Sequence, residues 1–163
     1  MQIIKDHKIV DDHSQHVAEG AGVDQLPAGD IIVPLALWQA HKEPLLQRQG
    51  QLGIRLNGDN DVTEIATELQ RFALIALQFP AFRDGRAYSI ARTLRQHYNY
   101  MGELRAVGNV LRDQAGYMAR VGFNAFEIDP KQDVQDALKA FGEISVKYQS
   151  SSDEPLPIYR RRA

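Results

Sequence analysis

The sequence predicts one α/β domain of about four strand–helix units with parallel strands. The units would form either half of a TIM-like (βα)8 barrel or a small open sheet, with an N-terminal β/α appendage. Three observations predict this fold. Apolar, strand-like runs begin near Leu52, Leu74, Leu104 and Ala125, which is about the spacing of βα units. A helical apolar pattern follows each run, and a length of 163 residues suits a single domain.

Residues 1–50 predict the appendage. QIIKDHKIV indicates a strand or small hairpin, the Gly, Pro and Asp residues of 20–30 indicate a loop, and IIVP indicates a short strand. Pro34 suits the first turn of a helix that runs through Trp38, and Pro44 should break or restart that helix. We expect Trp38 to anchor the core of this region.

Residues 51–145 predict the βα core. Its strands are QLGIRL, ALIALQF, ELRAVG and NAFEI, and the second is apolar throughout, as is typical of strands buried on both faces of a parallel sheet. Its helices are expected over 62–69, 86–98, 112–120 and the residues after Pro130. Half a barrel would leave unpaired strand edges, which predicts a homodimer or a docked partner. The polar, Pro-rich tail 146–163 is expected to pack back or to reach a neighbour.

Composition excludes several classes of function. The chain has no Cys, so it can hold no disulfide, thiolate nucleophile or Cys-ligated iron–sulfur cluster. No apolar run approaches the ~18 residues of a membrane span, and the first residues lack the apolar core of a signal peptide, which predicts a cytoplasmic protein without membrane contact. A pI of about 6.2 argues against nucleic-acid binding.

The sequence predicts no metal site and contains no nucleotide motif. His7, His13 and His16 cluster near the N-terminus, but neither Cys nor an HExxH helix accompanies them. GxGxxG and GxxxxGK[ST] are both absent, so the cofactor is unknown. FMN held through its phosphate at a helix N-terminus stays open.

The middle of the chain is rich in Arg. Residues 81–120 contain seven Arg, no Lys and three acidic residues. Guanidinium groups favour planar, bidentate recognition of carboxylate, phosphate or sulfur oxyanions. This region therefore indicates an anion site.

Sites in parallel α/β folds gather at the carboxyl ends of the strands. Two loops at this edge each place an Asp and an Arg at the start of a helix, where free N–H groups and the helix dipole favour an anion. The anion-binding candidates are Arg83, Arg86, Ser89, Asn109, Arg112 and Gln114. Asp84 and Asp113 are the candidates for acid or base catalysis. The alternative is structural: each Asp caps its own helix and pairs with the neighbouring Arg.

The run FPAFRDGRAYSIARTLRQHYNYMGELRAVGNVLRDQAGYMARVGFNAFEI resembles the core of a bacterial family named domain of unknown function 934. VPLALWQAHKEPLL, LGIRL and KYQSSSDEPLPIYRRR extend the resemblance over nearly the whole chain. The family pattern places DGR at residues 84–86, a Ser at Ser89, and the GELRA-G and LRDQ blocks at 102–108 and 111–114. A Lys is frequent in the family where this chain has Ala81, which leaves Arg83 to supply that cation.

The resemblance implies a role in sulfite reduction. The family is labelled an oxidoreductase of this process because its genes tend to neighbour that of the sulfite reductase haemoprotein. Our leading expectation is an accessory protein of assimilatory sulfite reduction that acts with this haemoprotein. The alternative is a small-molecule enzyme or binding protein for an oxyanionic metabolite, such as phosphate or a sulfur oxyanion, at the carboxyl edge of the strands.

Overall fold

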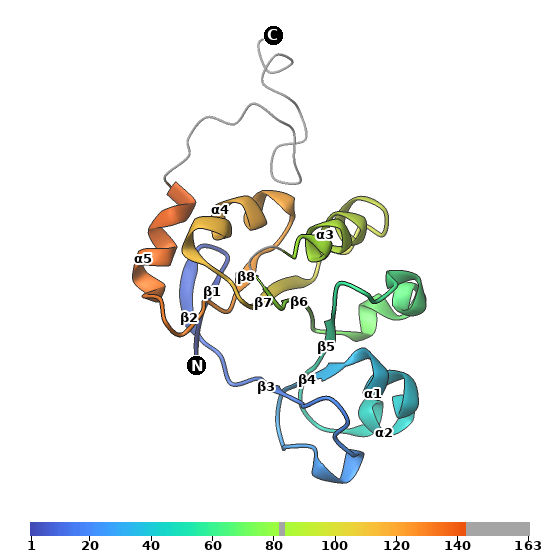
Figure 1. Ribbon diagram of the computed structural model, residues 1–163. Coiled ribbons are helices and arrows are strands. Elements are labelled where there is room, and N and C mark those ends of the chain that lie inside the picture. The colour runs from blue at the N-terminus through green and yellow to red at the C-terminus, as the bar shows by residue number, and fades with distance from the viewer. Residues whose placement is uncertain (82–83, 143–163) are drawn as a thin grey trace.

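The computed structural model describes residues 1–81 and 84–142. It contains an eight-stranded sheet in the order β2-β1-β8-β7-β6-β5-β4-β3. Figure 1 shows the strands as an arc with the helices on its outer side, which is the arrangement of a half-barrel. The predicted α/β half-barrel class is therefore confirmed. In the described part of the chain, no helix is long and apolar enough to cross a membrane.

Seven strands run in one direction, and β1 alone runs in the opposite direction. Adjacent strands from β3 through β8 pair in parallel, whereas β1 pairs antiparallel with both β8 and β2. The strand bounds are β1 Gln2–Lys5, β2 Lys8–Asp11, β3 Gln15–His16, β4 Ile31–Pro34, β5 Leu52–Leu56, β6 Leu74–Phe79, β7 Glu103–Gly108 and β8 Ala125–Phe126. Residues 1–50, which we expected as an appendage, thus contribute four strands to the same sheet.

The helices follow the predicted positions, with one difference in type. Their bounds are α1 Leu35–Ala40, α2 Lys42–Gln47, α3 Arg86–Gln96, α4 Arg112–Val121 and α5 Val134–Lys139, with 3-10 helices η1 Val23–Gln25, η2 Val62–Arg71 and η3 Ala140–Gly142. The segment that we predicted as an amphipathic α-helix over 62–69 is the 3-10 helix η2. The three-residue step from Val62 to Ile65 fits either helical period. Pro44 lies in the first turn of α2, so the helix restarts around it as predicted.

The two outer strands of the sheet are consecutive in the chain. Only residues 12–14 separate the end of β2 from the start of β3. Four peptide steps reach at most about 14 Å, so the end of β2 and the start of β3 lie within that distance of each other. β1 pairs with the edge of β8 that faces away from β7. We expected a homodimer because half a barrel leaves strand edges unpaired, but the edge of β8 is paired with β1.

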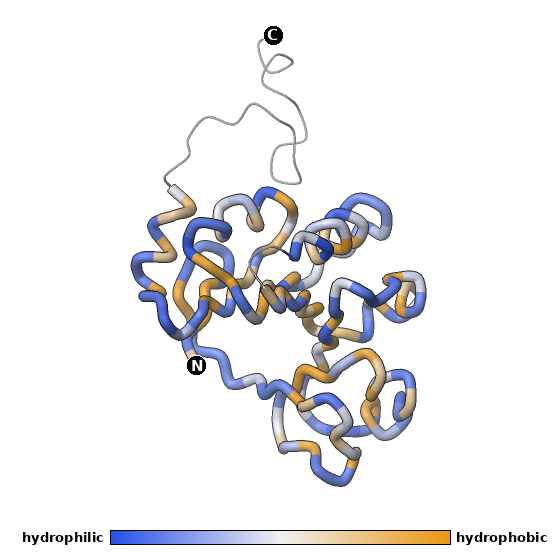
Figure 2. The backbone as a smooth tube through the Cα atoms, viewed as in Figure 1, coloured by the Kyte–Doolittle hydropathy of each residue, from blue (hydrophilic) through white to orange (hydrophobic). Residues whose placement is uncertain are grey.

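The main core lies between the outer face of the sheet and the helices. Alternate strand residues such as Ile54, Ile75 and Leu104 are fully buried there, together with Leu94 of α3 and Met118 of α4. Figure 2 shows apolar residues concentrated along the strands and polar residues along the outer turns of the helices. This packing fixes the carboxyl ends of the strands, where the site residues begin.

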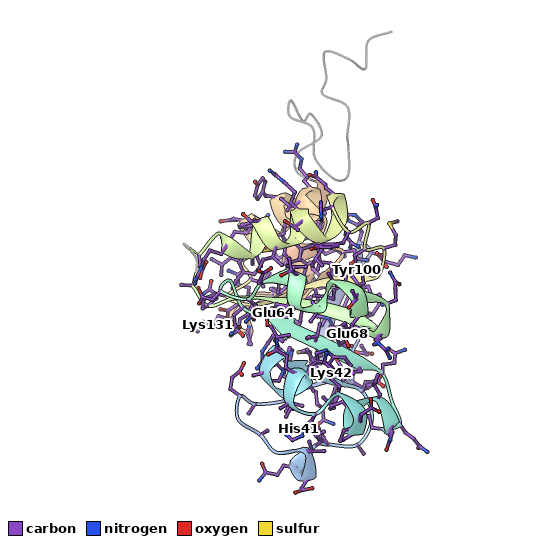
Figure 3. All side chains as sticks on the ribbon, turned by 90° about the vertical axis from the view of Figure 1, so that its right-hand side faces the viewer. His41, Lys42, Glu64, Glu68, Tyr100 and Lys131 are labelled. Atoms are coloured by element: carbon purple, nitrogen blue, oxygen red, sulfur yellow. The ribbon has the colours of Figure 1, made fainter. Side chains whose placement is uncertain are left out.

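Trp38 anchors the α1 region of this core, as predicted. Its side chain is fully buried, and its ring lies 4.9 Å from that of Phe72, edge to face. Its indole Nε1 donates to Glu68 Oε2 over 3.1 Å, and Lys42 Nζ lies 2.9 Å from the same oxygen. Figure 3 shows Lys42 and Glu68 close together on the helical side of the molecule. These contacts tie α1 and α2 to η2.

Candidate functional site

Asp84 and Arg86 form a local ion pair at the start of α3. Arg86 Nε and Nη2 donate to Asp84 over 2.9 and 2.6 Å, and the Arg86 backbone N–H donates to the same carboxylate. These hydrogen bonds from Arg86 lower the pKa of Asp84 to about 2. Asp84 is therefore ionised at neutral pH, where it has no proton to give as a general acid. Arg86 also pairs with Asp59, which follows β5.

Arg112 forms the corresponding group at the start of α4. Its Nη1 lies 3.4 Å from Asp113 Oδ1, and its Nε lies 2.9 Å from Asp136 Oδ2 on α5. The backbone N–H of Arg112 donates to Gln132 Oε1 over 2.7 Å. Arg112 therefore connects α4 to α5.

The two Arg–Asp loops reach toward opposite neighbours. Arg86 contacts the loop after β5, and Arg112 contacts the helix after β8. Among the described contacts, Arg86 and Arg112 share no carboxylate partner. Each Arg thus pairs with its neighbouring Asp, as the structural alternative predicts. A joint clamp by Arg86 and Arg112 stays a prediction.

The other predicted residues are spread along the same edge. Ser89 lies one turn into α3, where its carbonyl oxygen accepts from Thr93 Oγ1. Asn109 donates its backbone N–H to Phe79 O over 2.8 Å, and its Oδ1 is buried without a donor in the described part of the chain. The backbone N–H of Gln114 donates to Leu111 O within the first turn of α4. Arg83 lies outside the described residues.

A cleft of about 420 Å³ opens at the carboxyl ends of β5 and β6. It is lined by Glu19, Arg55, Asn57, Gly58, Asp59, Gln78, Pro80 and Arg86. Of the predicted site residues that the structure describes, Arg86 alone is among these. Gln78 and Arg55 are strand residues that were not among the predicted anion-binding candidates.

Arg55 is the most buried cation of the cleft. Its side chain is 11% exposed. Nη2 donates to Val17 O over 3.2 Å and to Glu19 Oε1 over 3.0 Å, while Nη1 lies 3.5 Å from His16 Nδ1. Its Nε is buried and has no acceptor among the described residues. A buried donor of a charged group normally has a partner, so this N–H is a candidate ligand contact.

A second polar group fills the inner face of the sheet beside the cleft. Arg105 of β7 is 2% exposed and forms ion pairs with Asp12, Glu103 and Glu127 at 2.7–3.0 Å. Its neighbours in the sheet register are small: Ala76 on β6 and Ala125 on β8. These alanines leave room for the long side chain inside the curled sheet.

The charges of this group perturb one another. Burial lowers the pKa of Arg105, but hydrogen bonds to Asp12 and Glu127 and the charge of Glu103 outweigh burial, so the net shift is upward. Burial raises the pKa of Asp12, yet hydrogen bonds from Arg105 and Ser14 leave it below its ordinary value. Arg105 and Asp12 are therefore both charged at neutral pH and pair with each other inside the sheet.

His16 links this inner group to the cleft. Its Nε2 lies 2.9 and 3.0 Å from the two oxygens of Glu127, and its Nδ1 faces Arg55 Nη1. A second cavity, of about 280 Å³, lies on the other side of Arg105, toward the amino ends of the strands. Within residues 1–81 and 84–142, no three His, Asp or Glu side chains are grouped as metal ligands.

The start of α3 does not suit the phosphate of FMN. Asp84 already accepts from the Arg86 backbone N–H and from the Arg86 side chain. A phosphate at this helix terminus would have to displace a carboxylate of the same charge.

A comparison with family models matches residues 53–159 to the family described as bacterial protein of unknown function, DUF934. A comparison with curated proteins found no match. The matched range includes the strands β5 to β8, the helices between them and most of the cleft residues. The chain therefore belongs to the DUF934 family of bacterial proteins.

Proposed function

We propose that this chain binds a small oxyanion in the cleft at the carboxyl ends of β5 and β6. The observation that carries the proposal is Arg55, a largely buried guanidinium whose Nε–H has no acceptor among the described residues. Gln78 adds an amide donor to the lining, and Arg86 adds a second guanidinium. Charge-assisted donors in a partly enclosed cleft suit phosphate or a sulfur oxyanion.

The proposed setting is assimilatory sulfite reduction in the cytoplasm, alongside the sulfite reductase haemoprotein. The resemblance of the DGR, GELRA-G and LRDQ blocks to their family pattern supports this setting, because the family's genes tend to neighbour that of the haemoprotein. An oxyanion site would fit this setting, because sulfite is itself a small oxyanion. In this proposal the protein binds the anion, and the haemoprotein carries the redox centre.

Arg55→Gln should weaken the binding of inorganic phosphate by about 10- to 100-fold, because one charge-assisted hydrogen bond contributes about 1.5–3 kcal/mol. Isothermal titration calorimetry of the wild-type protein and the variant measures the two Kd values. Arg92→Gln is the matched control, since Arg92 is an exposed guanidinium on α3 that does not line the cleft. We expect this control to bind phosphate as the wild type does.

Circular dichroism of Arg55→Gln checks that lost binding is not lost folding, because Arg55 also bonds Val17 and Glu19. Equal phosphate affinity in Arg55→Gln and the wild type would contradict the proposed site. So would a wild-type protein that binds neither phosphate nor sulfite.

The proposed setting has its own test. Size exclusion with light scattering should show a complex between this protein and the sulfite reductase haemoprotein of the same organism, and it reads out a homodimer in the same run. Deleting the gene should slow growth when sulfate is the sole sulfur source. Normal growth and separate elution would argue against the setting while leaving the oxyanion site intact.

A further inference from the structure

The side chains that line the cleft carry no net positive charge. Two guanidinium groups line it, those of Arg55 and Arg86, and two carboxylates line it as well, those of Glu19 and Asp59. Each cation is paired with one of these acids: Arg55 Nη2 lies 3.0 Å from Glu19 Oε1, and Arg86 contacts Asp59. The formal charge of the lining is therefore balanced, so a dianion gains little from net attraction.

Acceptors surround the cation that would hold the ligand. Glu19 lies against one terminal nitrogen of Arg55, and His16 Nδ1 lies 3.5 Å from the other. Because His16 Nε2 is within 3.0 Å of both oxygens of Glu127, the proton of a neutral imidazole belongs on Nε2. Nδ1 is then an acceptor, and the hydrogen bond from Arg105 holds Glu127 in place behind it.

A ligand that fits this cleft must bring both kinds of hydrogen-bonding group. Its anionic oxygens can accept from Arg55, and it needs at least one donor to face Glu19. An oxyanion whose oxygens are all unprotonated offers no such donor, and it would place lone pairs against the Glu19 carboxylate. A protonated oxyanion meets both requirements.

We propose that the cleft selects an oxyanion that keeps a proton, with Glu19 accepting its O–H while Arg55 donates to its other oxygens. This inference rests on the proposed oxyanion site and names its ligand class. Hydrogenphosphate and hydrogensulfite belong to the class, and sulfate does not. The site thereby separates sulfite from sulfate through the proton rather than through size.

The preference for a protonated oxyanion over an unprotonated one should be moderate. Fully enclosed sites that hydrogen-bond a hydroxyl reject analogues without one by large factors. The Glu19 side chain is 59% exposed, so water can satisfy part of what the ligand lacks. We therefore expect about a tenfold preference, not the factors of enclosed sites.

Phosphate and sulfate are the matched probes, because they share shape and size while only phosphate carries an O–H at pH 7. Calorimetry of the wild-type protein should give a Kd for phosphate about tenfold below that for sulfate. In Glu19→Gln the ratio should fall toward one, because the amide N–H can donate to sulfate. Glu43→Gln, on the exposed side of α2, should keep the wild-type ratio.

Each outcome bears on one of the two proposals. Sulfate affinity equal to or above that of phosphate, or an unchanged ratio in Glu19→Gln, would overturn the selection of a protonated ligand while leaving the oxyanion site in place. Absence of binding by either anion to the wild-type protein would overturn the proposed site, and this inference with it.

Discussion

Replacing Arg105 with methionine should lower the free energy of unfolding by about 3–5 kcal/mol, the cost of removing one partner from a buried ion pair. Met fills similar space but leaves Asp12 and Glu127 without the cation that holds both. Lys5 remains 2.6 Å from Glu103 and compensates that carboxylate alone. Urea denaturation followed by circular dichroism at pH 7 measures the difference.

The loss of stability in Arg105→Met should depend on pH. In the wild type the pKa of Asp12 lies below its ordinary value of 3.8, so its contribution to stability is present above that value and is lost as the pH falls through the lowered pKa. In Arg105→Met this contribution is missing, and Asp12 and Glu127, which have lost their cation, bind protons more readily. The stability difference between the two proteins should therefore shrink as the pH falls below about 4.

Arg92→Met is the control for Arg105→Met, because it makes the same chemical change at an exposed position. Its free energy of unfolding should stay within about 0.5 kcal/mol of the wild-type value at both pH 7 and pH 3. A loss of stability in Arg105→Met no larger than in this control would show that the inner ion pairs contribute nothing net. A difference that persists undiminished at pH 3 would show that the lost packing, and not the charges, is responsible.

The βα core could be predicted from local pattern. Each parallel strand is a short apolar run that ends in a polar loop, and each following helix carries a stripe that faces the sheet. The pairing of β1 with β8 could not be predicted this way, because it joins residues more than a hundred positions apart. Nothing local in QIIK indicates which strand it will cover.

The candidate site was predictable at its loops but not inside the sheet. The pairing of Asp84 with Arg86 follows from spacing of two residues at a helix start, and the sequence indicates it directly. Arg55 and Arg105 each stand alone in an apolar strand, and the pattern alone does not say which face they take. A signal was present: a cation in a buried strand needs an acid partner, and Glu103 lies two residues from Arg105. Asp12 and Glu127 are brought to it only by the curl of the sheet.

Gly108 should tolerate no side chain, because it ends β7 at the carboxyl edge with φ at +89°. An added Cβ would lie 2.5 Å from Phe79 O, a backbone atom of the neighbouring strand. Gly108→Ala thus combines a left-handed backbone, which costs about 1–2 kcal/mol for an L-residue, with a contact that only separation of β6 and β7 can relieve. We expect a total loss of roughly 3 kcal/mol in urea denaturation.

Gly20→Ala isolates the first of these two costs, because Gly20 has φ at +76° and no atom within 4 Å of the added Cβ. Its loss should stay at about 1–2 kcal/mol. Equal losses in the two variants would show that the strands at the cleft edge move apart without cost. A larger loss in Gly108→Ala, with weaker phosphate binding in the folded variant, would show that the β6–β7 contact holds the cleft in shape. The ligand contacts at Arg55 would then depend on backbone packing at a strand end that carries no ligand group of its own.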